Sequence, residues 1–525
     1  MQHIRQGGGG VVVYDAADWR AGLGPQGKFE STQSLKQGNE NGFVTTTNID
    51  PLVSNGVLSP GVAPSANVTN SANLAGTIVD FQVKDNTVVY GIDNGGKLHT
   101  IDYTTNTISA SRTLPVTTPI GQNLMIYKHN SAGTPTTSLF YSYYVNANFD
   151  IGAYIGLSSF DDDFMSSVPA TPLDITSGDG DDTTQRTQPH VMEVGSDDIM
   201  YIGSGRYLHA YDGATGTNGT FSSKVLTLPA GFQIIALKKK DDKLLITGNY
   251  YSTSSSGIGK ALCYVWNYRD LDVTEVIDLE DYYVSACFLW KGAPAFVTNG
   301  VIERNGANKV KVLSGSTVEN IADFDGTMPI NSGIVVINRM IFLNAGGKII
   351  AVGNKYVKSN AVNHIATLSQ NGTSGILFYN TAASLLAGSA ASGASYCFNN
   401  INNGAGSGSA VTYYFDPQFA PGKRGKAKSI IIEYEKPIAA GGTNGNVSIS
   451  LGFDTNSQTR TIVANKSSVV VPLVKRYLYS TTGEPMPEFN TFRFTFSWAA
   501  STNGVSPTIS RVIFEYDDVN VNISV

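Results

Sequence analysis

A short cassette that occurs twice constrains the fold of this chain more than any other feature. Residues 97–107 read KLHTIDYTTNT, and residues 206–217 read RYLHAYDGATGT. Aligned on His99 and His209, both give Leu-His-x-apolar-Asp, followed by a short Thr/Gly/Asn turn that ends in Thr. An inner strand that runs into a tight turn in this way is typical of propeller-type β-proteins, which repeat it from blade to blade.

The distance between the two histidines indicates a repeat period. They are 110 residues apart (209 − 99), and weaker copies of the cassette occur at about half that step. The copies are residues 152–157, 262–267 and 309–313, and in the second of them Cys263 takes the place of the histidine. Apolar residues that alternate with a period of two, closed by Gly, Asn, Asp or Ser, predict strands and turns. We therefore expect about six or seven blades of roughly 45–55 residues each.

Segments between these copies show the same alternation and are predicted strands. They are residues 87–92, 138–145, 199–203, 243–248, 333–343 and 375–379. Residues 15–23 and 381–388 are the two candidates for short helices. The fold class expected from this pattern is all-β.

The polar residues of the cassettes have a functional and a structural interpretation. A histidine with a carboxylate at a fixed spacing can act as a base or as a ligand. The copies of the cassette replace the histidine by Tyr or Cys, so we favour blade packing for His99 and His209. Asp102 and Asp212 are expected to accept hydrogen bonds from backbone N–H groups in the turns that follow. No catalytic residue is predicted.

Length and composition limit the class of protein. At 525 residues the chain is too long for a single core, and only 15% of it is charged, against a usual quarter. Its surface must therefore consist largely of Asn, Thr, Ser and Gly, as in proteins that pack against other subunits. A net charge of −6 argues against a nucleic-acid-binding surface. Cys263, Cys287 and Cys397 form no CxxC pair and have no histidine at metal spacing, so neither a zinc site nor a bound cofactor is predicted.

Three regions differ in composition. Residues 1–76 are irregular and rich in Gly, Ser and Asn, which predicts an extended N-terminal arm that crosses a propeller face, supplies a closing strand or reaches a neighbouring subunit. Residues 77–420 are the predicted propeller. Residues 421–525 have strands at the spacing of a β-sandwich. These predicted strands are residues 429–434, 446–453, 459–464, 468–474, 491–498 and 510–516.

Side-chain alternation within the predicted sandwich indicates which face is buried. Phe492, Phe494, Phe496 and Trp498 fall on one face of their strand, with polar residues between them. Core packing explains this stripe better than a binding platform does. The basic cluster at residues 423–428 is interpreted as a solvated linker between the two domains.

Other stretches imitate known sites. Residues 22–29 match GxGxxG and most of a P-loop, but Phe29 stands where the P-loop needs Ser or Thr for Mg²⁺. The acidic residues at 161–163, 174 and 179–182 offer ligands for Ca²⁺. They lack the spacing of an EF-hand, so a solvated acidic loop is favoured. The basic residues 238–240, followed by two aspartates, are interpreted as a hairpin end.

In layout the chain resembles the structural proteins of tailed-bacteriophage virions. The resemblance rests on residues 42–43, 48–51 and 56–61 in the arm, on the low-charge propeller, and on residues 430–434 and 512–516. It implies a tail or tail-associated protein that is assembled in several copies in the host cytoplasm. The arm and the sandwich would contact other copies and other virion proteins. The resemblance assigns no site residues.

Three hypotheses for function follow. The first is a non-enzymatic scaffold or hub of a phage tail. The second is a carbohydrate- or receptor-binding module at a tail tip, which exposed Trp or Tyr on a propeller face would favour. The third is a propeller glycan hydrolase, which needs paired carboxylates in its channel. The chain starts without an apolar h-region and has no run of 18 apolar residues, so neither a signal peptide nor a membrane role is expected.

Overall fold

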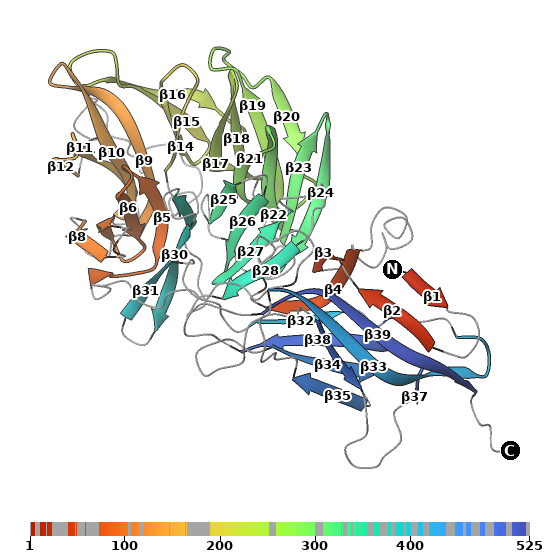
Figure 1. Ribbon diagram of the computed structural model, residues 1–525. Helices are drawn as coiled ribbons and strands as arrows, with labels where there is room; N and C mark the ends of the chain where they lie inside the picture. The colour runs from red at the N-terminus through yellow and green to blue at the C-terminus, as the bar shows by residue number, and fades with distance from the viewer. Residues whose placement is uncertain are drawn as a thin grey trace. The chain divides into compact units, whose positions relative to one another are not determined.

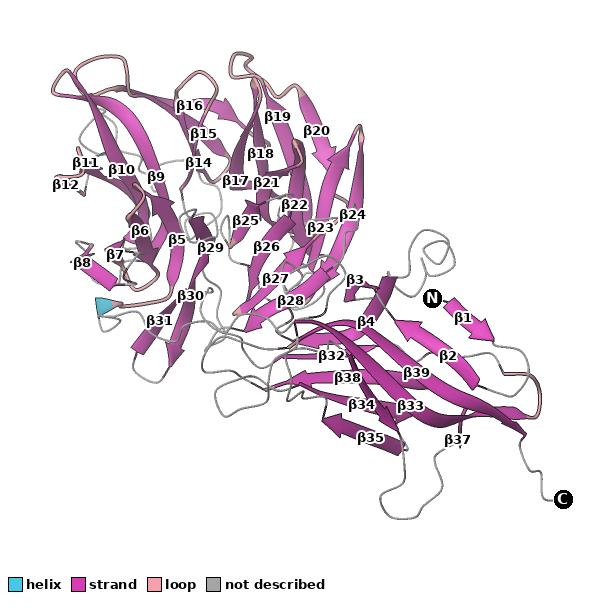
Figure 2. Ribbon diagram, in the orientation of Figure 1, coloured by secondary structure: helices cyan, strands magenta, loops and turns pink. Residues whose placement is uncertain are grey.

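A computed structural model gives the structure of the protein (Figure 1). Every element with defined bounds in it is a strand, which confirms the all-β expectation, and these strands are drawn in magenta in Figure 2. The two predicted helices are wrong, since residues 18–23 and 384–392 form strands. The residues that the structure describes are 2–5, 11–16, 18–23, 40–47, 49, 58, 73–102, 105, 107–114, 120–145, 148–162, 164, 190–250, 259–299, 308–326, 328, 333–337, 340–353, 362–367, 376–379, 384–392, 395–400, 408–412, 415, 419–436, 447–454, 458–463, 473–477, 488–499 and 507–520.

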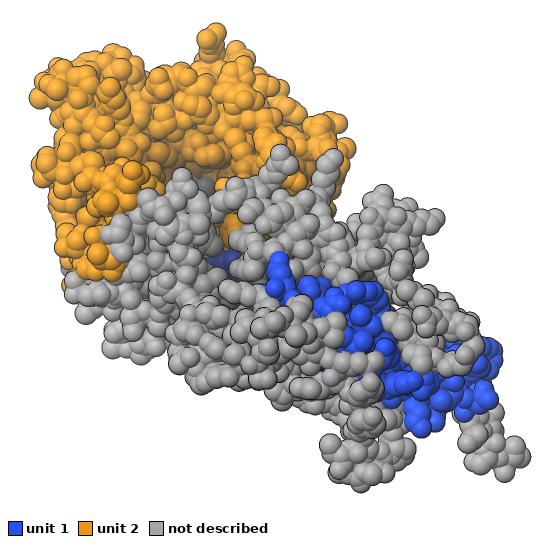
Figure 3. Space-filling model, viewed as in Figure 1, with its two compact units in different colours: residues 1–64, 349–367, 401–525 blue, residues 65–348, 368–400 orange. Residues whose placement is uncertain are grey.

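The chain divides into two compact units, each coloured separately in Figure 3. The propeller unit consists of residues 65–348 and 368–400. The terminal unit consists of residues 1–64, 349–367 and 401–525. The predicted division at residues 76 and 420 stays a prediction. Neither unit is one continuous segment, a feature that composition alone did not indicate.

The propeller unit is built from successive antiparallel sheets in which each strand pairs with the next along the chain. Five of these sheets have four strands among the described residues. Their strands are β5 (Ile78–Val83), β6 (Val88–Asp93), β7 (Lys97–Asp102) and β8 (Thr107–Thr113); β9 (Ile120–Ser131), β10 (Thr134–Val145), β11 (Asn148–Ile155) and β12 (Ser159–Asp161); β13 (Val191–Val194), β14 (Met200–Ser204), β15 (Tyr207–Asp212) and β16 (Thr220–Thr227); β17 (Phe232–Lys240), β18 (Lys243–Tyr250), β19 (Lys260–Trp266) and β20 (Glu275–Asp278); β21 (Tyr283–Trp290), β22 (Ala293–Asn299), β23 (Asn308–Ser314) and β24 (Thr317–Phe324).

Two further groups of strands follow these five sheets in the propeller unit. They are β25 (Ile334–Ile337) with β26 (Met340–Ala345), and β29 (Ile376–Tyr379) with β30 (Ser384–Ser392) and β31 (Ser395–Asn400). The first strands of successive sheets contact one another in the order β5, β9, β13, β17, β21, β25 and β29, and β29 contacts β5. This closed ring of first strands is the arrangement of a β-propeller. The number of complete blades stays a prediction, because these last two groups contribute two and three strands to the unit.

Polar side chains join three neighbouring first strands of the ring. Asp80 on β5 accepts hydrogen bonds from Asn123 Nδ2 at 3.0 Å and from the Leu124 backbone N–H at 2.8 Å, both on β9. Asn123 Oδ1 accepts one from the Met192 backbone N–H of β13 at 3.2 Å. Burial raises the pKa of Asp80 to about 7 in spite of these bonds. These hydrogen bonds hold β5, β9 and β13 at a fixed spacing.

The terminal unit contains two sheets. One has the order β1 (Gln2–Arg5), β2 (Val11–Ala16), β39 (Thr508–Asn520), β33 (Lys423–Lys436) and β36 (Leu473–Tyr477), and β37 (Glu488–Phe489) also pairs with β33. The strands of the other sheet that belong to this unit run in the order β27 (Lys348–Val352), β28 (Val362–Thr367), β3 (Asp18–Leu23), β4 (Glu40–Thr47), β32 (Gly408–Thr412), β38 (Phe492–Trp498), β34 (Val447–Phe453) and β35 (Gln458–Val463). Strands from the N-terminal region and from the C-terminal region therefore share both sheets.

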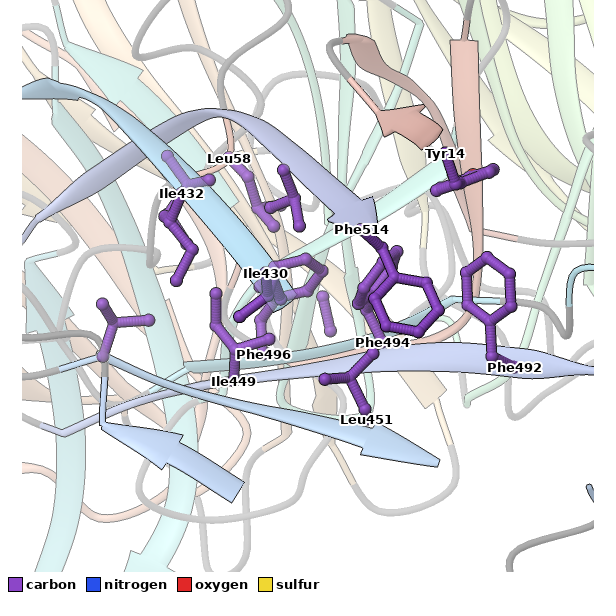
Figure 4. Packing of buried hydrophobic residues seen from close by; sticks show 14 of the residues in the cluster. Tyr14, Leu58, Ile430, Ile432, Ile449, Leu451, Phe492, Phe494, Phe496 and Phe514 are labelled. Atoms are coloured by element: carbon purple, nitrogen blue, oxygen red, sulfur yellow. The ribbon is translucent and has the colours of Figure 1, made fainter. Parts of the chain in front are cut away.

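One buried cluster takes side chains from both of these sheets. Tyr14, Ile430 and Phe514 come from the first sheet, and Ile449 and Phe494 come from the second (Figure 4). The predicted stripe from Phe492 to Trp498 lies in this cluster with exposed fractions of 0–3%, so its interpretation as core is confirmed. Two sheets on either side of one core is the packing from which β-sandwiches are built.

The terminal unit corrects the prediction for residues 423–428 and shows how the described strands of the N-terminal region are paired. Residues 423–428 are the start of β33, paired with β39, and not a solvated linker. In the N-terminal region the described strands pair within the chain, as β2 does with β39. Arg511 on β39 donates hydrogen bonds to both carboxylate oxygens of Asp15 on β2, which joins the two ends of the chain.

Candidate functional site

The first cassette places its histidine in a complete hydrogen-bond network. His99 on β7 has Nε2 2.8 Å from Asp93 Oδ2 and Nδ1 2.7 Å from the Ser111 hydroxyl on β8. Asp93 ends β6 and also accepts the backbone N–H groups of Ala75 at 2.9 Å and Lys97 at 2.8 Å. The side chains of His99 and Asp93 are fully buried. Asp93 and Ser111 were not singled out by the sequence, although Asp93 begins the turn that precedes the cassette.

Burial and hydrogen bonding have opposite effects on the pKa of Asp93. Burial raises the pKa of its carboxyl, but the hydrogen bond and charge of His99 and the two backbone N–H groups outweigh burial, so the pKa is lowered. The carboxylate form therefore accepts a hydrogen bond from His99 Nε2. In a neutral ring with its proton on Nε2, Nδ1 accepts the hydroxyl proton of Ser111, and in a charged ring Nδ1–H donates to that hydroxyl oxygen.

A serine, a histidine and a carboxylate in a chain of hydrogen bonds suggest nucleophilic catalysis. The burial of His99 argues against that use, because a general base must return its proton to a leaving group that it can reach. Ser111 is exposed in the edge strand β8, but it does not lie in the sharp strand-to-helix turn that presents a catalytic serine in a nucleophile elbow. The network instead pins three strands of one sheet together, as the structural interpretation predicts.

The second cassette has a similar histidine in different surroundings. His209 on β15 lies opposite Ile202, so Ser204 stands where the first sheet has Asp93. The pairing of β15 with β16 is irregular beside His209, and Nδ1 accepts the backbone N–H of Lys224 at 3.3 Å. The ring of His209 stacks on Phe221 with centroids 5.6 Å apart. Burial, and then His190 and Lys224, lower the pKa of His209 to about 3.

A third copy of the cassette has a lysine in place of the histidine. Lys311 on β23 is 4% exposed, and its Nζ lies 2.8 Å from Asp281 Oδ2 and 2.6 Å from the Leu279 carbonyl. Asp281 also accepts hydrogen bonds from Lys309 Nζ at 2.8 Å and the Thr298 hydroxyl at 2.6 Å. Burial raises the pKa of Asp281, but its bonds to Lys309, Lys311 and Thr298 outweigh it and lower the pKa.

The copy at Cys263 is not equivalent to these three. Cys263 packs with Cys287 and Phe296 of the following sheet. Leu98 and Leu208, adjacent to the two histidines, face the following sheets, so the histidines face the other way. The interpretation that Cys263 takes the histidine's place is therefore wrong by one residue. Both cysteines are free and buried, which raises the pKa of the Cys287 thiol to about 12.

The cassette aspartates accept backbone hydrogen bonds, as predicted. Asp102 Oδ1 accepts the N–H of Thr105 at 3.2 Å. Asp212 Oδ1 accepts the N–H of Ala214 at 2.9 Å, and its other oxygen accepts the hydroxyl of Thr215. Both side chains therefore stabilise the turns that follow their strands.

Only part of the acidic stretch lies within the described residues. Asp162 is held by an ion pair with Arg112 and by the hydroxyl of Tyr141 at 2.5 Å. The guanidinium of Arg112 lies 3.8 Å from the ring centre of Phe160, and Tyr154 stacks on that ring at 4.1 Å and 10°. Two groups this close to one ring must occupy opposite faces of it. Arg112 on β8 and Phe160 on β12 therefore join two neighbouring sheets. Asp163, Asp174 and residues 179–182 lie outside the described residues.

The structure describes some of the remaining predicted features and not others. Lys238–Lys240 do end a hairpin strand, since β17 ends at Lys240 and β18 begins at Lys243. Residues 22 and 23 end β3, and 24–29 lie outside the described part, as does the side chain of Cys397. Within the part that the structure describes, no three His, Cys, Asp or Glu side chains are grouped to hold a metal, and no helix could span a membrane.

Comparison with known proteins adds little to this description. No family model matches the chain, and no curated protein matches it. The β-propeller domain of Cps50 (Swd1) from Myceliophteria thermophila aligns with 65% of this chain and 99% of its own length, at 7% identity and a TM-score of 0.40. The computationally designed Ika8 protein aligns with 64% of this chain and 100% of its own, at 11% identity and a TM-score of 0.36. Likenesses at these TM-scores carry no argument about function.

Proposed function

We propose that this protein is a structural component of a tailed-bacteriophage tail, where several copies form a scaffold or hub assembled in the host cytoplasm. The low charge of the chain and its layout support this proposal. The polar groups of the first cassette also support it, because they are used to hold strands together. The contacts with other copies and with other virion proteins are proposed to be made through the N-terminal arm and the C-terminal sandwich.

The interleaved path of the chain is the observation that carries the proposal. The chain passes between the two units after residues 64, 348, 367 and 400. The first and last parts of the chain meet in one sheet, where β2 pairs with β39 from Val11–Asp517 to Ala16–Val512. Neither unit can be cut from the chain as a module, which suits a permanent building block better than an appended binding domain.

Self-association of the full chain tests this proposal. Two copies with different affinity tags are expressed together, captured through one tag and probed for the other, and the mass of the product is measured by light scattering. We expect the second tag to be recovered with the first, in particles of several copies. A chain that is monomeric at micromolar concentration, with no recovery of the second tag, would overturn the proposal.

A second candidate function has one observation in its favour. Carbohydrate or receptor binding at a tail tip calls for exposed aromatic side chains on the propeller, and Tyr250 and Tyr282 are 40% and 42% exposed. Phe160 is 38% exposed, but both faces of its ring are covered by Arg112 and Tyr154. Among the described residues, the two tyrosines are therefore the aromatic groups on which this alternative depends.

A further inference from the structure

Two exposed tyrosines have backbone carbonyl groups that approach one glycine, Gly259. Tyr250 is the last residue of β18, and Tyr282 directly precedes β21. A β-carbon placed on Gly259 would lie 2.6 Å from the carbonyl oxygen of Tyr282 and 3.7 Å from that of Tyr250. The backbones of both tyrosines therefore approach the same point of the surface, although 32 positions separate them in the sequence.

A half-exposed ion pair adjoins the tyrosines. Lys260 follows Gly259 and lies opposite Tyr250 in the antiparallel register of β18 and β19. Its Nζ lies 2.8 Å from Asp278 Oδ2, and the two side chains are 55% and 48% exposed. Because the pair is open to solvent, its ammonium and carboxylate keep free positions for donating and accepting hydrogen bonds.

The segment that carries Tyr282 is held by buried charges. Lys311 donates to the Leu279 carbonyl, and Asp281 binds both Lys311 and Lys309. The Asp281 carbonyl accepts the Ala261 N–H at 2.9 Å, and the Tyr282 N–H donates to the Asn299 carbonyl at 3.2 Å. Burying such charges is costly unless they are fully paired, and here their pairing fixes residues 279–282. Tyr282 is thus presented from a segment whose position is set in advance, which lowers the entropy cost of binding.

We propose that Tyr250, Tyr282, Lys260 and Asp278 form a binding site for a hydroxyl-rich, uncharged oligosaccharide. The apolar C–H face of a sugar ring packs against an aromatic side chain, and neighbouring hydroxyls suit one donor and one acceptor. The exposed charges of Lys260 and Asp278 balance, which favours a neutral ligand. This inference rests on the second candidate function, and it names the residues and the class of ligand for it.

Binding of the full chain to an array of neutral hexose and N-acetylhexosamine oligomers tests the site. We expect binding to at least one oligomer, and a loss of roughly tenfold or more in Tyr250→Ala and Tyr282→Ala, as for an aromatic side chain at the centre of a contact. Tyr282→Phe keeps the ring and is expected to bind within about threefold of the natural chain. Phe160→Ala is the matched control, because that ring has similar exposure but no free face.

The outcomes separate the site from the proposed functions. A natural chain that binds no oligomer overturns both this inference and the saccharide-binding candidate, and leaves the tail proposal to the tag-recovery experiment. Binding that both alanine variants retain overturns the site alone. A strong decrease in affinity when NaCl rises from about 0.05 M to about 0.5 M contradicts a neutral ligand. Melting temperatures equal to that of the natural chain show that the alanine variants are folded.

Discussion

The two Leu-His cassettes are alike in sequence and differ in what surrounds the histidine. His99 lies between a carboxylate, Asp93, and a hydroxyl, Ser111, at 2.8 and 2.7 Å. His209 has Ser204 at the position of Asp93, and a backbone N–H at 3.3 Å takes the place of the hydroxyl. His99 is therefore paired with a carboxylate, whereas burial, and then His190 and Lys224, lower the pKa of His209.

This difference shows that strands on either side of a motif decide its chemistry. Neither Asp93 nor Ser111 belongs to the shared part of the cassette, since they lie six residues before and twelve after His99. A buried donor or acceptor must find a partner, but any neighbouring strand can supply it. The following predictions test how far the two sheets differ for this reason.

Removing the carboxylate should have the largest effect. Asp93→Ala removes the acceptor of three hydrogen bonds and leaves His99 and two backbone N–H groups buried without it. We expect a loss of about 3–5 kcal/mol, because three donors lose a charged acceptor and each such loss costs about 1–3 kcal/mol. Thermal and urea unfolding of the natural chain and the variant measure this loss.

The second sheet supplies the matched control for Asp93. Ser204→Ala alters the corresponding position beside His209 and is expected to cost about 1 kcal/mol, because it removes only a neutral polar group. If both variants lose the same stability, the network around His99 has no special role and the comparison between the sheets fails.

Lowering the pH should decrease the stability of the folded chain through His209, the histidine of the second cassette. The pKa of His209 is about 3 in the folded chain and close to 6.5 when unfolded, so the unfolded state takes up the proton first as the pH falls. Stability is therefore lost between about pH 6.5 and pH 3, by about 3 kcal/mol at pH 4. Urea unfolding at pH 7 and pH 4 should show a smaller loss for His209→Leu than for the natural chain.

Comparing variants is necessary because other groups titrate in the same range. The pKa of Asp80 is raised to about 7, so its contribution decreases as the pH rises from about 4 to 7, in the opposite direction. Asp93, with its lowered pKa, loses its contribution only below the ordinary carboxyl range. Phe221→Leu, which alters a ring stacked on His209 but adds no titrating group, should keep the pH dependence of the natural chain. If the stability of His209→Leu depends on pH as strongly as that of the natural chain, the loss between about pH 6.5 and pH 3 does not come from His209.

The lysine copy of the cassette extends the comparison to a third sheet. Lys311→Met keeps the length of the side chain but leaves the Asp281 carboxylate with Lys309 and Thr298 alone. We expect a loss of about 2 kcal/mol, less than for Asp93 because two partners remain. Lys309→Met removes a 29% exposed lysine from the same carboxylate and should cost less. Equal losses in the two variants, measured by urea unfolding, would show that burial of Lys311 adds nothing.

Much of the fold followed from alternation and turns. The strand at residues 243–248 and the stripe at Phe492–Trp498 were predicted because one face of each is apolar and the period is two. Residues 18–23 were not, since a sequence with mixed polarity contains no information about a partner such as β4, 20 residues further on. The assignment of residues 423–428 as a linker was wrong for the same reason. Their basic side chains resemble those of a solvated segment, and the sequence does not show that they pair with β39.

The candidate site was less predictable because its residues meet across strands. A period of about 55 residues located Cys263 but could not place it on the correct face, since a shift of one residue reverses every side chain in a strand. Irregular pairing at Ile78/Asp80 and Val284/Ala286 introduces such shifts in the first strands. Tyr250 and Tyr282 approach each other only through the ring of sheets, so no local pattern linked them.

The turn aspartates provide the smallest test, outside the buried networks. Asp212 accepts the Ala214 N–H and the Thr215 hydroxyl, and Asp102 accepts the Thr105 N–H at the corresponding place in the first sheet. Asp212→Ala should lower stability by about 1 kcal/mol, because solvent can replace part of what a turn at the surface loses. Asp212→Asn keeps an acceptor oxygen and should lose about half as much. If thermal unfolding shows that Asp212→Ala loses as much as Asp93→Ala, the difference between the sheets does not come from the buried carboxylate.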